Sequence, residues 1–464
     1  MPDRLNIIIV GAGDAGMLLA KDLESENGIN FVGFIDDNLK SKVIGSIKDI
    51  EAICNIHKIN EIVIAIPSAD GVLIRNILLN LQNTRIPIKI IPRELQIIRT
   101  SRVRYADARN LVTEDFLGRK YDKHNLSGMR KYFKDKKVFV SGGAGSIGSE
   151  IVQQLLQLDI ECVMVYDNSE YLMFNLHQHL KESNYPMNYQ LVIGNILNRQ
   201  KLQRCYETFK PDVVIHAAAY KHVHLMQENI DEAIMNNLQG TINIVDSAIY
   251  CKIPQLTFIS TDKAVNPTSV MGATKRLGEW YIQNKYLNIP KLKWDIVRFG
   301  NVINSNGSVL PLFERQISVG GEITVTHKNV SRFFMSIKEA SRLVIESTAD
   351  NISNSTHVLN MGELVNIYEI AKCLIRSKNL IPNIDVKINI TGLRKGEKMT
   401  EELFTDEEAG KLIVNHKGKV FSIKLTDTNN NLDQILLDLT NAAKDGQNTS
   451  SKTQLKNIFP SLVT

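Results

Sequence analysis

Short apolar runs recur along the N-terminal part of the chain, at residues 6–10, 31–35, 61–66 and 86–91. The segments between them are long enough for helices, and this alternation is typical of an α/β fold with a parallel sheet. Pro87 has no N–H to donate to a neighbouring strand, so the last run should be an edge strand or should begin just after it. We expect a small Rossmann-like unit over residues 1–95.

A second series of apolar runs follows at residues 137–140, 162–166, 190–193, 212–216, 256–259 and 294–298. This repeated alternation with helical segments predicts a doubly wound parallel sheet. The stretch before it is rich in Arg, Lys, Asp and Asn and lacks a long apolar period, which is typical of a connector. The last part of the chain is polar, with one short helix expected at 432–443. We therefore divide the chain into segments 1–95, 96–135, 136–425 and 426–464.

Composition narrows the possible function classes. The 464 residues carry a formal net charge of +5 and no Lys/Arg block, so nucleic-acid binding is not expected. The five cysteines stand singly, which favours reduced thiols in the cytoplasm and argues against a disulfide frame or a bound metal. No apolar run reaches the roughly eighteen residues of a membrane helix, and the first residues do not form a signal peptide. We expect a cytoplasmic protein without a membrane span.

Two glycine-rich turns follow predicted strands. In the first, Gly11, Gly13 and Gly16 lie between the strand at 6–10 and a helix, which is the pattern of a dinucleotide-binding turn. The next strand ends at Asp36, where a ribose-binding acid would lie. No acid–base group accompanies this turn, and its glycines could equally serve close packing of the helix against the strand. We interpret the first unit as regulatory or structural.

The second turn has Gly142, Gly145 and Gly148, directly after the apolar run at 137–140. These glycines would let the backbone approach a pyrophosphate, whose charge would then face the N-terminus of the following helix. The next strand ends at Asp167, whose carboxylate could accept hydrogen bonds from ribose hydroxyls and would repel a 2′-phosphate. Because no Arg follows nearby, the sequence favours NAD over NADP.

Three polar residues follow the apolar run at 256–259. Thr261, Asp262 and Lys263 stand where this buried strand is predicted to end. Open α/β sheets bind ligands at the carboxyl ends of their strands. A solvated surface turn would also explain an Asp-Lys pair, but it would not explain the place of the pair beside a Thr at the sheet edge. The sequence therefore predicts an acid and a base side by side at the ligand site.

Met271 and Lys275 lie one helical turn apart on the helix that follows. Together with Thr261 they resemble the active site of extended short-chain dehydrogenase/reductases, in which a hydroxyl residue, a Tyr and a Lys serve hydride transfer. The pair Asp262–Lys263 resembles the acid and base of nucleotide-sugar 4,6-dehydratases. Met271 at the Tyr position resembles one subgroup of them, the bacterial UDP-N-acetylglucosamine 4,6-dehydratases of surface-glycan synthesis.

This resemblance is dense over residues 137–425. It implies an α/β protein of two Rossmann-like units, the second of the extended short-chain dehydrogenase/reductase type with a small C-terminal substrate-binding subdomain. It also implies NAD as cofactor, a UDP-sugar as substrate and assembly into a homo-oligomer. Many relatives of this subgroup carry membrane helices before the first unit, so the native protein would be membrane-associated if such helices precede this sequence.

The resemblance also assigns roles to individual residues. The catalytic group would be Thr261, Asp262, Lys263, Met271 and Lys275. The cofactor would be contacted by Gly142, Gly145, Ser146, Ile147, Gly148, Asp167, Asn168, Ser169, Asn195, Ile196, Ala217, Ala218, Ala219 and Lys275. The UDP-sugar would be contacted by Lys221, His222, Asn301, Ser308, Val309, Thr324, Arg332, Arg394 and Glu397. Within these sets, the Asn195 amide oxygen could accept a bond from the adenine amino group, and the two Arg residues could each hold a phosphate oxygen.

The implied reaction is redox-neutral: oxidation at C4 of the hexose, loss of water across C5 and C6, and return of the hydride to C6. Asp262 would act as a protonated acid and Lys263 as a neutral base, and burial is expected to shift both pKa values in those directions. Met271 has no proton to exchange. Either Asp262 or a water held by Thr261 takes the proton of the C4 hydroxyl, or Met271 is packing in an inactive enzyme.

Two alternatives stay open. A UDP-sugar 4-epimerase would share the cofactor-binding half but has no use for the Asp262–Lys263 pair. A non-catalytic, NAD-bound regulatory protein would explain Met271 but leaves the pair and the Arg residues unexplained.

Overall fold

The computed structural model describes residues 4–38, 42–92, 103–118, 126–287, 289, 291–350, 352–415, 418–424 and 431–463. The chain forms two compact units. The first combines residues 1–122, 308–330 and 365–392, and the second combines residues 123–307, 331–364 and 393–464. The segment boundaries predicted at 95/96 and 425/426 lie outside the described residues.

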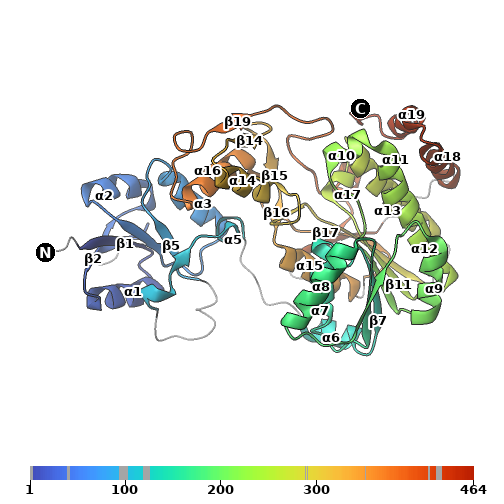
Figure 1. The fold of residues 1–464 in the computed structure, drawn as a ribbon, viewed down its shortest axis with the longest axis horizontal. Helices are drawn as coiled ribbons and strands as arrows, with labels where there is room; N and C mark the ends of the chain where they lie inside the picture. The colour runs from blue at the N-terminus through green and yellow to red at the C-terminus, as the bar shows by residue number, and fades with distance from the viewer. Residues whose placement is uncertain are drawn as a thin grey trace. The chain divides into compact units, whose positions relative to one another are not determined.

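The sheet of the first unit contains, within the described ranges, six strands in the order β3-β2-β1-β4-β5-β6. Its strands β1, β2 and β5 are labelled in Figure 1. Its neighbouring strands pair in parallel except for β5 and β6, which are antiparallel. The strands are β1 (Leu5–Val10), β2 (Ile29–Ile35), β3 (Val43–Gly45), β4 (Glu61–Ile64), β5 (Ile88–Ile90) and β6 (Arg109–Asn110). The helices are α1 (Asp14–Ser25), α2 (Ile50–Ile56), α3 (Gly71–Asn80) and α5 (Thr113–Leu117). Of the two predictions for the run at 86–91, the start just after Pro87 is confirmed.

Residues from the second half of the sequence complete this unit. They form α14 (Val309–Ser318), α16 (Ile367–Ser377) and a parallel pair of strands, β14 (Ile323–Val325) and β19 (Ile388–Ile390). Helix α16 packs against α3. Its fully buried Arg376 donates hydrogen bonds to the carbonyl oxygens of Leu81 and Ile86 and to the hydroxyl of Thr84. These segments of the predicted substrate-binding subdomain thus pack on the N-terminal unit, which no local sequence pattern indicates.

The sheet of the second unit contains nine strands within the described ranges, in the order β20-β21-β17-β12-β11-β10-β7-β8-β9. The seven strands β17, β12, β11, β10, β7, β8 and β9 pair in parallel with their neighbours. Strands β21 and β20 pair antiparallel and form one edge of the sheet. The chain moves outward from β7 in both directions, which is the doubly wound arrangement with a switch point between β7 and β10. The predicted α/β fold class is confirmed.

The bounds of these elements follow the predicted runs closely. The strands are β7 (Lys137–Ser141), β8 (Cys162–Asp167), β9 (Tyr189–Ile193), β10 (Val213–His216), β11 (Gln255–Ile259), β12 (Lys293–Arg298), β17 (Ser355–Leu359), β20 (Leu412–Asn415) and β21 (Val420–Ile423). The helices include α7 (Ser146–Leu155), α8 (Glu170–Glu182), α9 (Arg199–Phe209), α10 (Val223–Glu228), α11 (Ile230–Ala233), α12 (Gly240–Tyr250), α13 (Val270–Leu287) and α15 (Ile337–Thr348). Short strands β13 (Asn301–Val302) and β16 (Phe334–Met335) pair beside them.

Both faces of this central sheet are buried, because successive side chains of a strand point to opposite faces. In β7, Phe139 belongs to one apolar cluster, whereas Val138 and Val140 belong to the other. Near-continuous apolar strands are what a parallel sheet covered on both sides requires. The carboxyl ends of β7, β8, β10 and β11 therefore meet along one edge, over a rigid core.

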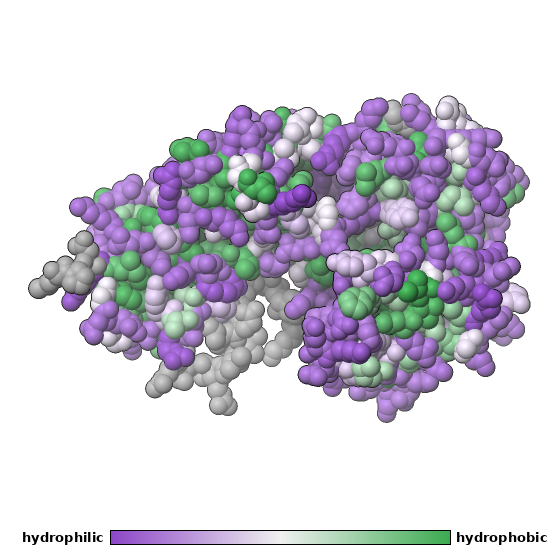
Figure 2. Space-filling view, viewed as in Figure 1, coloured by the Kyte–Doolittle hydropathy of each residue, from purple (hydrophilic) through white to green (hydrophobic). Residues whose placement is uncertain are grey.

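The C-terminal segment contains two helices, α18 (Leu432–Lys444) and α19 (Asn448–Ile458), where the sequence suggested a single short one. Leu436 and Leu455 are buried in the same apolar cluster as residues of α13. The face of the molecule in Figure 2 is largely hydrophilic, interrupted by separate groups of hydrophobic residues. Among the described residues, no helix has both the length and the apolar character needed to cross a membrane.

Candidate active site at the carboxyl edge of the second sheet

The glycine turn between β7 and α7 brings two backbone segments into close contact. Gly142 has a φ of +67°, and a Cβ on it would lie 2.5 Å from the backbone nitrogen of Ala218. A Cβ on Gly148 would lie 2.1 Å from the carbonyl oxygen of Gly142. No side chain fits at either position, because the neighbouring backbone occupies the space that a Cβ would need. Helix α7 begins at Ser146 and points its N-terminus toward the turn.

Asp167 is fixed at the end of β8 by two backbone donors. Its Oδ2 accepts a hydrogen bond from the backbone N–H of Ala144 at 3.1 Å, and its Oδ1 accepts one from Ser169 at 3.0 Å. The residue is only 8% exposed. The carboxylate is thereby tied to the glycine turn, in the position from which it could bind a ribose and oppose a 2′-phosphate.

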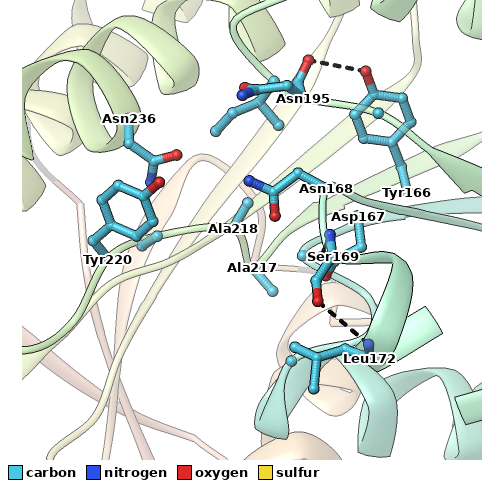
Figure 3. Close-up of a pocket in the computed structure, with 15 residues that line it drawn as sticks. Tyr166, Asp167, Asn168, Ser169, Leu172, Asn195, Ala217, Ala218, Tyr220 and Asn236 are labelled. Atoms are coloured by element: carbon cyan, nitrogen blue, oxygen red, sulfur yellow. Dashed lines mark hydrogen bonds between the residues drawn. The ribbon is translucent and has the colours of Figure 1, made fainter. Parts of the chain in front are cut away.

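A cavity lies against this turn and the ends of β8 and β10, lined by Gly142, Gly145, Tyr166, Asp167, Asn168, Ser169, Leu172, Gly194, Asn195, Ile196, Ala217, Ala218, Ala219, Tyr220 and Asn236 (Figure 3). Most of the residues to which the sequence assigned cofactor contact lie in this one lining. Ser146, Ile147 and Gly148 lie on the adjoining first turn of α7. Lys275 lies on α13 and does not line the cavity.

Sequence reasoning missed Tyr166, Leu172, Gly194, Tyr220 and Asn236. The sequence held a signal for Gly194, which directly follows the apolar run at 190–193. In the structure a Cβ there would lie 2.4 Å from the Tyr166 ring. The Tyr166 hydroxyl donates to the Asn195 carbonyl oxygen at 3.0 Å. No spacing rule indicates Asn236, because it enters the cavity from a π-helical turn over 234–239. Such turns are frequent at functional sites.

The Asn195 side chain accepts a hydrogen bond from the backbone of a residue close by in the sequence. Its amide oxygen accepts a hydrogen bond from the backbone N–H of Leu197 at 2.8 Å. This is the oxygen expected to accept a bond from adenine. It would therefore serve both donors.

Asp262 and Lys263 form a hydrogen-bonded ion pair one turn beyond β11. Lys263 Nζ lies 3.0 Å from Asp262 Oδ1 and 3.0 Å from Asn301 Oδ1. The Thr261 hydroxyl donates to the same Asp262 oxygen at 2.9 Å. Asp262 is fully buried, and among the described residues its Oδ2 has no hydrogen-bond partner. A Cβ on Gly300 would lie 3.0 Å from that oxygen, so the glycine leaves it space.

The charge state of this pair differs from the sequence-based expectation. Burial lowers the pKa of Lys263, but the carboxylates of Asp262 and Glu401 raise it more, so the pKa lies above its ordinary value of 10.5. The expectation that burial leaves Lys263 neutral is therefore wrong for the resting protein. The physical reason is that the carboxylate of Asp262, and after it that of Glu401 at 3.6 Å from Nζ, together outweigh burial.

Helix α13 carries Met271 and Lys275 past this pair. A Cβ on Gly272 would lie 2.1 Å from the Lys263 carbonyl oxygen, so the two backbones are in contact. Met271 is 4% exposed and packs in the apolar core. Lys275 Nζ lies 3.8 Å from the centroid of the Phe258 ring. Burial lowers the pKa of Lys275 to about 7, against the opposing effect of the Glu279 carboxylate.

Two of the residues expected to bind the UDP-sugar are paired with each other. The buried Arg332 donates from Nη2 to Glu397 Oε1 at 2.9 Å. Glu397 Oε2 in turn accepts from the backbone N–H of Arg394. The exposed Arg394 side chain lies 3.5 Å from His224 Nδ1. This arrangement concentrates two guanidinium groups and one carboxylate around a single loop.

The remaining expected sugar contacts divide between the two units. Lys221, His222 and Asn301 belong to the second unit. There the His222 ring fills the space beside Gly307, where a Cβ would lie 2.5 Å from its Cε1. Ser308, Val309 and Thr324 belong to the first unit, at the start of α14 and in β14. The Thr324 hydroxyl accepts a hydrogen bond from Gln316 at 2.9 Å.

Comparison with known proteins extends this picture. A family model described as "Polysaccharide biosynthesis protein" matches residues 138–423, and a "CoA-binding domain" model matches residues 2–92. The crystal structure titled "X-ray structure of Pen from Bacillus thuringiensis" is 35% identical with a TM-score of 0.58, over 63% of this chain and 90% of that one.

Three sequence relatives are informative. The capsular polysaccharide biosynthesis protein CapD of Staphylococcus aureus is 35% identical over 86% of this chain and 69% of its own length. An inverting UDP-N-acetylglucosamine 4,6-dehydratase of Campylobacter jejuni is 29% identical, and a UDP-glucose 4-epimerase of Rickettsia canadensis is 31% identical, each over 60% of this chain and 80% of the relative. The family model covers residues 138–423, and the chain has the doubly wound sheet and the glycine turn described above. The chain therefore belongs to the polysaccharide biosynthesis protein family of nucleotide-sugar dehydratases and epimerases.

Proposed function

We propose that the protein is an NAD-dependent UDP-N-acetylglucosamine 4,6-dehydratase that serves bacterial surface-glycan synthesis. The observation that carries this proposal is the Asp262–Lys263 pair beyond β11, hydrogen bonded at 3.0 Å and in backbone contact with α13. Elimination of water across C5 and C6 needs an acid and a base that reach adjacent carbons from one side of the site. The similarity to the Campylobacter dehydratase supports the substrate.

The resting ion pair differs from the reactive state by the place of one proton. Transfer of a proton from Lys263 Nζ to Asp262 Oδ1, across 3.0 Å, converts ammonium and carboxylate into neutral amine and carboxylic acid. The amine then takes the C5 proton while the acid protonates the departing C6 hydroxyl, which leaves as water. These two transfers restore the ammonium and the carboxylate. The pair therefore needs no proton from solvent during the elimination.

The residues around the cavity fit a dinucleotide. Gly142 and Gly145 line the cavity without side chains, and α7 begins at Ser146 directly after this turn, as a pyrophosphate site requires. Asp167 would accept hydrogen bonds from the adenosine ribose and favours NAD over NADP. Lys275 would contact the nicotinamide ribose. When bound, NAD supplies the acceptor for the C4 hydride and its donor for C6.

The proton of the C4 hydroxyl needs another acceptor than the residue at the Tyr position. Met271 is buried and its thioether accepts hydrogen bonds only weakly. Asp262 has to receive the Lys263 proton for the elimination, so it is not free to keep the proton of the C4 hydroxyl as well. We assign the C4 hydroxyl proton to a water held by the Thr261 hydroxyl.

A UDP-sugar 4-epimerase is the second candidate, and the similarity to the Rickettsia epimerase favours it. An epimerase oxidises C4 and returns the hydride to the same carbon, so it has no use for a buried acid–base pair beside that carbon. The presence of this acid–base pair, hydrogen bonded at 3.0 Å beyond β11, favours the dehydratase.

The test is to incubate the protein with UDP-N-acetylglucosamine and NAD and to analyse the nucleotide sugar by mass spectrometry. A dehydratase gives a product lighter by one water, an epimerase gives an isomer of unchanged mass, and a non-catalytic protein gives no product. Absence of water loss under conditions in which the protein binds NAD would contradict the proposal.

Lys263→Ala separates the role of the base from the rest of the site. The variant should fold and bind NAD like the wild type, because Lys263 lies outside the cavity lining, but it should not release water. The measurement is the initial rate of water loss, with NAD occupancy as the control for folding. Retention of more than about a few per cent of the wild-type rate would show that another group removes the C5 proton.

A further inference from the structure

Glu401 is a buried acid that the sequence did not single out. Its side chain is 4% exposed, and its Oε1 lies 3.6 Å from Lys263 Nζ and 3.9 Å from Arg332 Nε. Among the described residues, its Oε2 is buried without a hydrogen-bond partner. Taking a carboxylate out of water costs free energy unless charge partners repay it. Glu401 has Lys263 and Arg332 as partners, both beyond ordinary hydrogen-bond distance.

We infer that Glu401 is a positioning residue that holds the Lys263 ammonium in place and keeps the shared proton on the Asp262–Lys263 pair. The inference rests on the proposed function, in which Lys263 acts through that proton. When Asp262 receives the proton and becomes neutral, Glu401 is the charged carboxylate that stays beside Nζ. It therefore stabilises the ammonium that forms again when Lys263 takes the C5 proton.

The charges that face Lys263 support this role. Burial lowers the pKa of Lys263, the Asp262 and Glu401 carboxylates raise it, and the Arg332 guanidinium lowers it, with a net increase above 10.5. Asn301 faces the same nitrogen as a neutral acceptor. In the proposed mechanism, activity should end at high pH when Lys263 loses the proton that it shares with Asp262. Removal of the Glu401 charge should bring that limit to lower pH.

The neighbouring Glu402 provides a matched control. Its side chain is 51% exposed and accepts hydrogen bonds from Lys398 and Asn266, not from Lys263. Glu401→Gln and Glu402→Gln therefore remove the same charge one residue apart, and only the first change alters the surroundings of Lys263. Glu401→Asp keeps the negative charge, but the shorter side chain places it farther from Lys263 Nζ.

The direct measurement is the pH dependence of Lys263 acetylation by acetic anhydride, read from its peptide by mass spectrometry in the full-length protein. Glu401→Gln should move the midpoint to lower pH by about one to three units, since a carboxylate within ~4 Å shifts a pKa by that much. Glu402→Gln should not move it, and Glu401→Asp should give an intermediate value. In turnover, the high-pH limb of kcat should move with the acetylation midpoint, while KM and NAD occupancy stay unchanged.

The outcomes separate the two proposals. If the wild type releases no water from UDP-N-acetylglucosamine, the proposed function fails, yet the acetylation midpoints still test Glu401. If the wild type turns over but Glu401→Gln has the wild-type midpoint, the role of Glu401 is wrong and the function stands. If Glu401→Gln does not fold, an unchanged midpoint in Glu401→Asp overturns the inference by itself.

Discussion

The two lysines of the candidate site have pKa values shifted in opposite directions. Lys263 lies between the carboxylates of Asp262 and Glu401, which outweigh burial and raise its pKa above 10.5. Lys275 lies over the Phe258 ring, and burial lowers its pKa to about 7. The sequence predicted the pair and the spacing of the helix residues because both are local. Burial alone would leave Lys263 neutral, but its charge depends on the neighbouring Asp262 carboxylate and on Glu401, which lies far along the chain.

Met271 and Lys275 should differ sharply in their effect on catalysis. Met271→Ala removes packing in the core and should lower kcat by about tenfold or less, since a truncated side chain costs mainly local stability. Lys275→Ala removes the buried amine proposed to contact the nicotinamide ribose, with a pKa of about 7, and should cost far more, because its protonated form would act on the transition state. Steady-state rates, with NAD occupancy as the control for folding, test this. Equal loss in both variants would mean that the thioether has a direct role in the reaction.

At the scale of elements, the predicted strand–turn–helix units match the structure because their signals are local. The glycine spacing reflects the close backbone contacts at Gly142 and Gly148. The end of β8 is marked by Asp167, which accepts hydrogen bonds from the backbone N–H groups of Ala144 and Ser169. The π-helical turn that presents Asn236 has no such signal. A π-helical turn contains one more residue than an α-helical turn, and the spacing of residues in the sequence does not indicate where this occurs. The helix α19 was missed because its sequence is mostly polar.

The end of β8 should select the cofactor. The purified protein should carry or prefer NAD, because the Asp167 carboxylate would oppose a 2′-phosphate. Asp167→Ala should lower NAD content, whereas Asp36→Ala, which removes the corresponding acid of the first unit, should leave it unchanged. Nucleotide released by denaturation and identified by chromatography gives the answer. NADP as the main species would contradict the assignment.

The C-terminal helices should contribute to the folded core of the second unit. Leu436 on α18 is 1% exposed, whereas its neighbour Leu437 is 53% exposed. Leu436→Ala should lower the free energy of unfolding by about 2–5 kcal/mol, because it leaves a cavity. Leu437→Ala should change it little. Denaturant titrations of both variants provide the measurement, and equal midpoints would show that α18 does not pack as described.

At the scale of the whole molecule, the first unit is assembled from distant parts of the chain. Two segments from the second half of the sequence, 308–330 and 365–392, group with the N-terminal residues. Arg376 on α16 reaches the Leu81 carbonyl oxygen at 2.8 Å and the Thr84 hydroxyl at 3.1 Å. Hydrophobic periodicity predicts which residues of α16 are buried, but it does not predict which surface covers them.

Arg376 and Arg85 offer a matched test of this assembly. Arg376 is fully buried, whereas Arg85 forms an ion pair with Asp385 and its side chain is 60% exposed. Arg376→Ala leaves buried acceptors without a donor and should lower the free energy of unfolding by about 3 kcal/mol or more. Arg85→Ala should change Tm little, because solvent screens an exposed pair. If both substitutions change Tm equally, the packing of α16 on α3 is not as described.

The most direct test of the proposed function follows one hydrogen atom. UDP-N-acetylglucosamine that carries deuterium at C4 should give a product lighter by one water, with the deuterium in the new methyl group at C6. Mass spectrometry and deuterium NMR locate the label. Deuterium that stays at C4 of a C4-inverted sugar of unchanged mass would show an epimerase, and it would contradict the acid–base role proposed for Asp262 and Lys263.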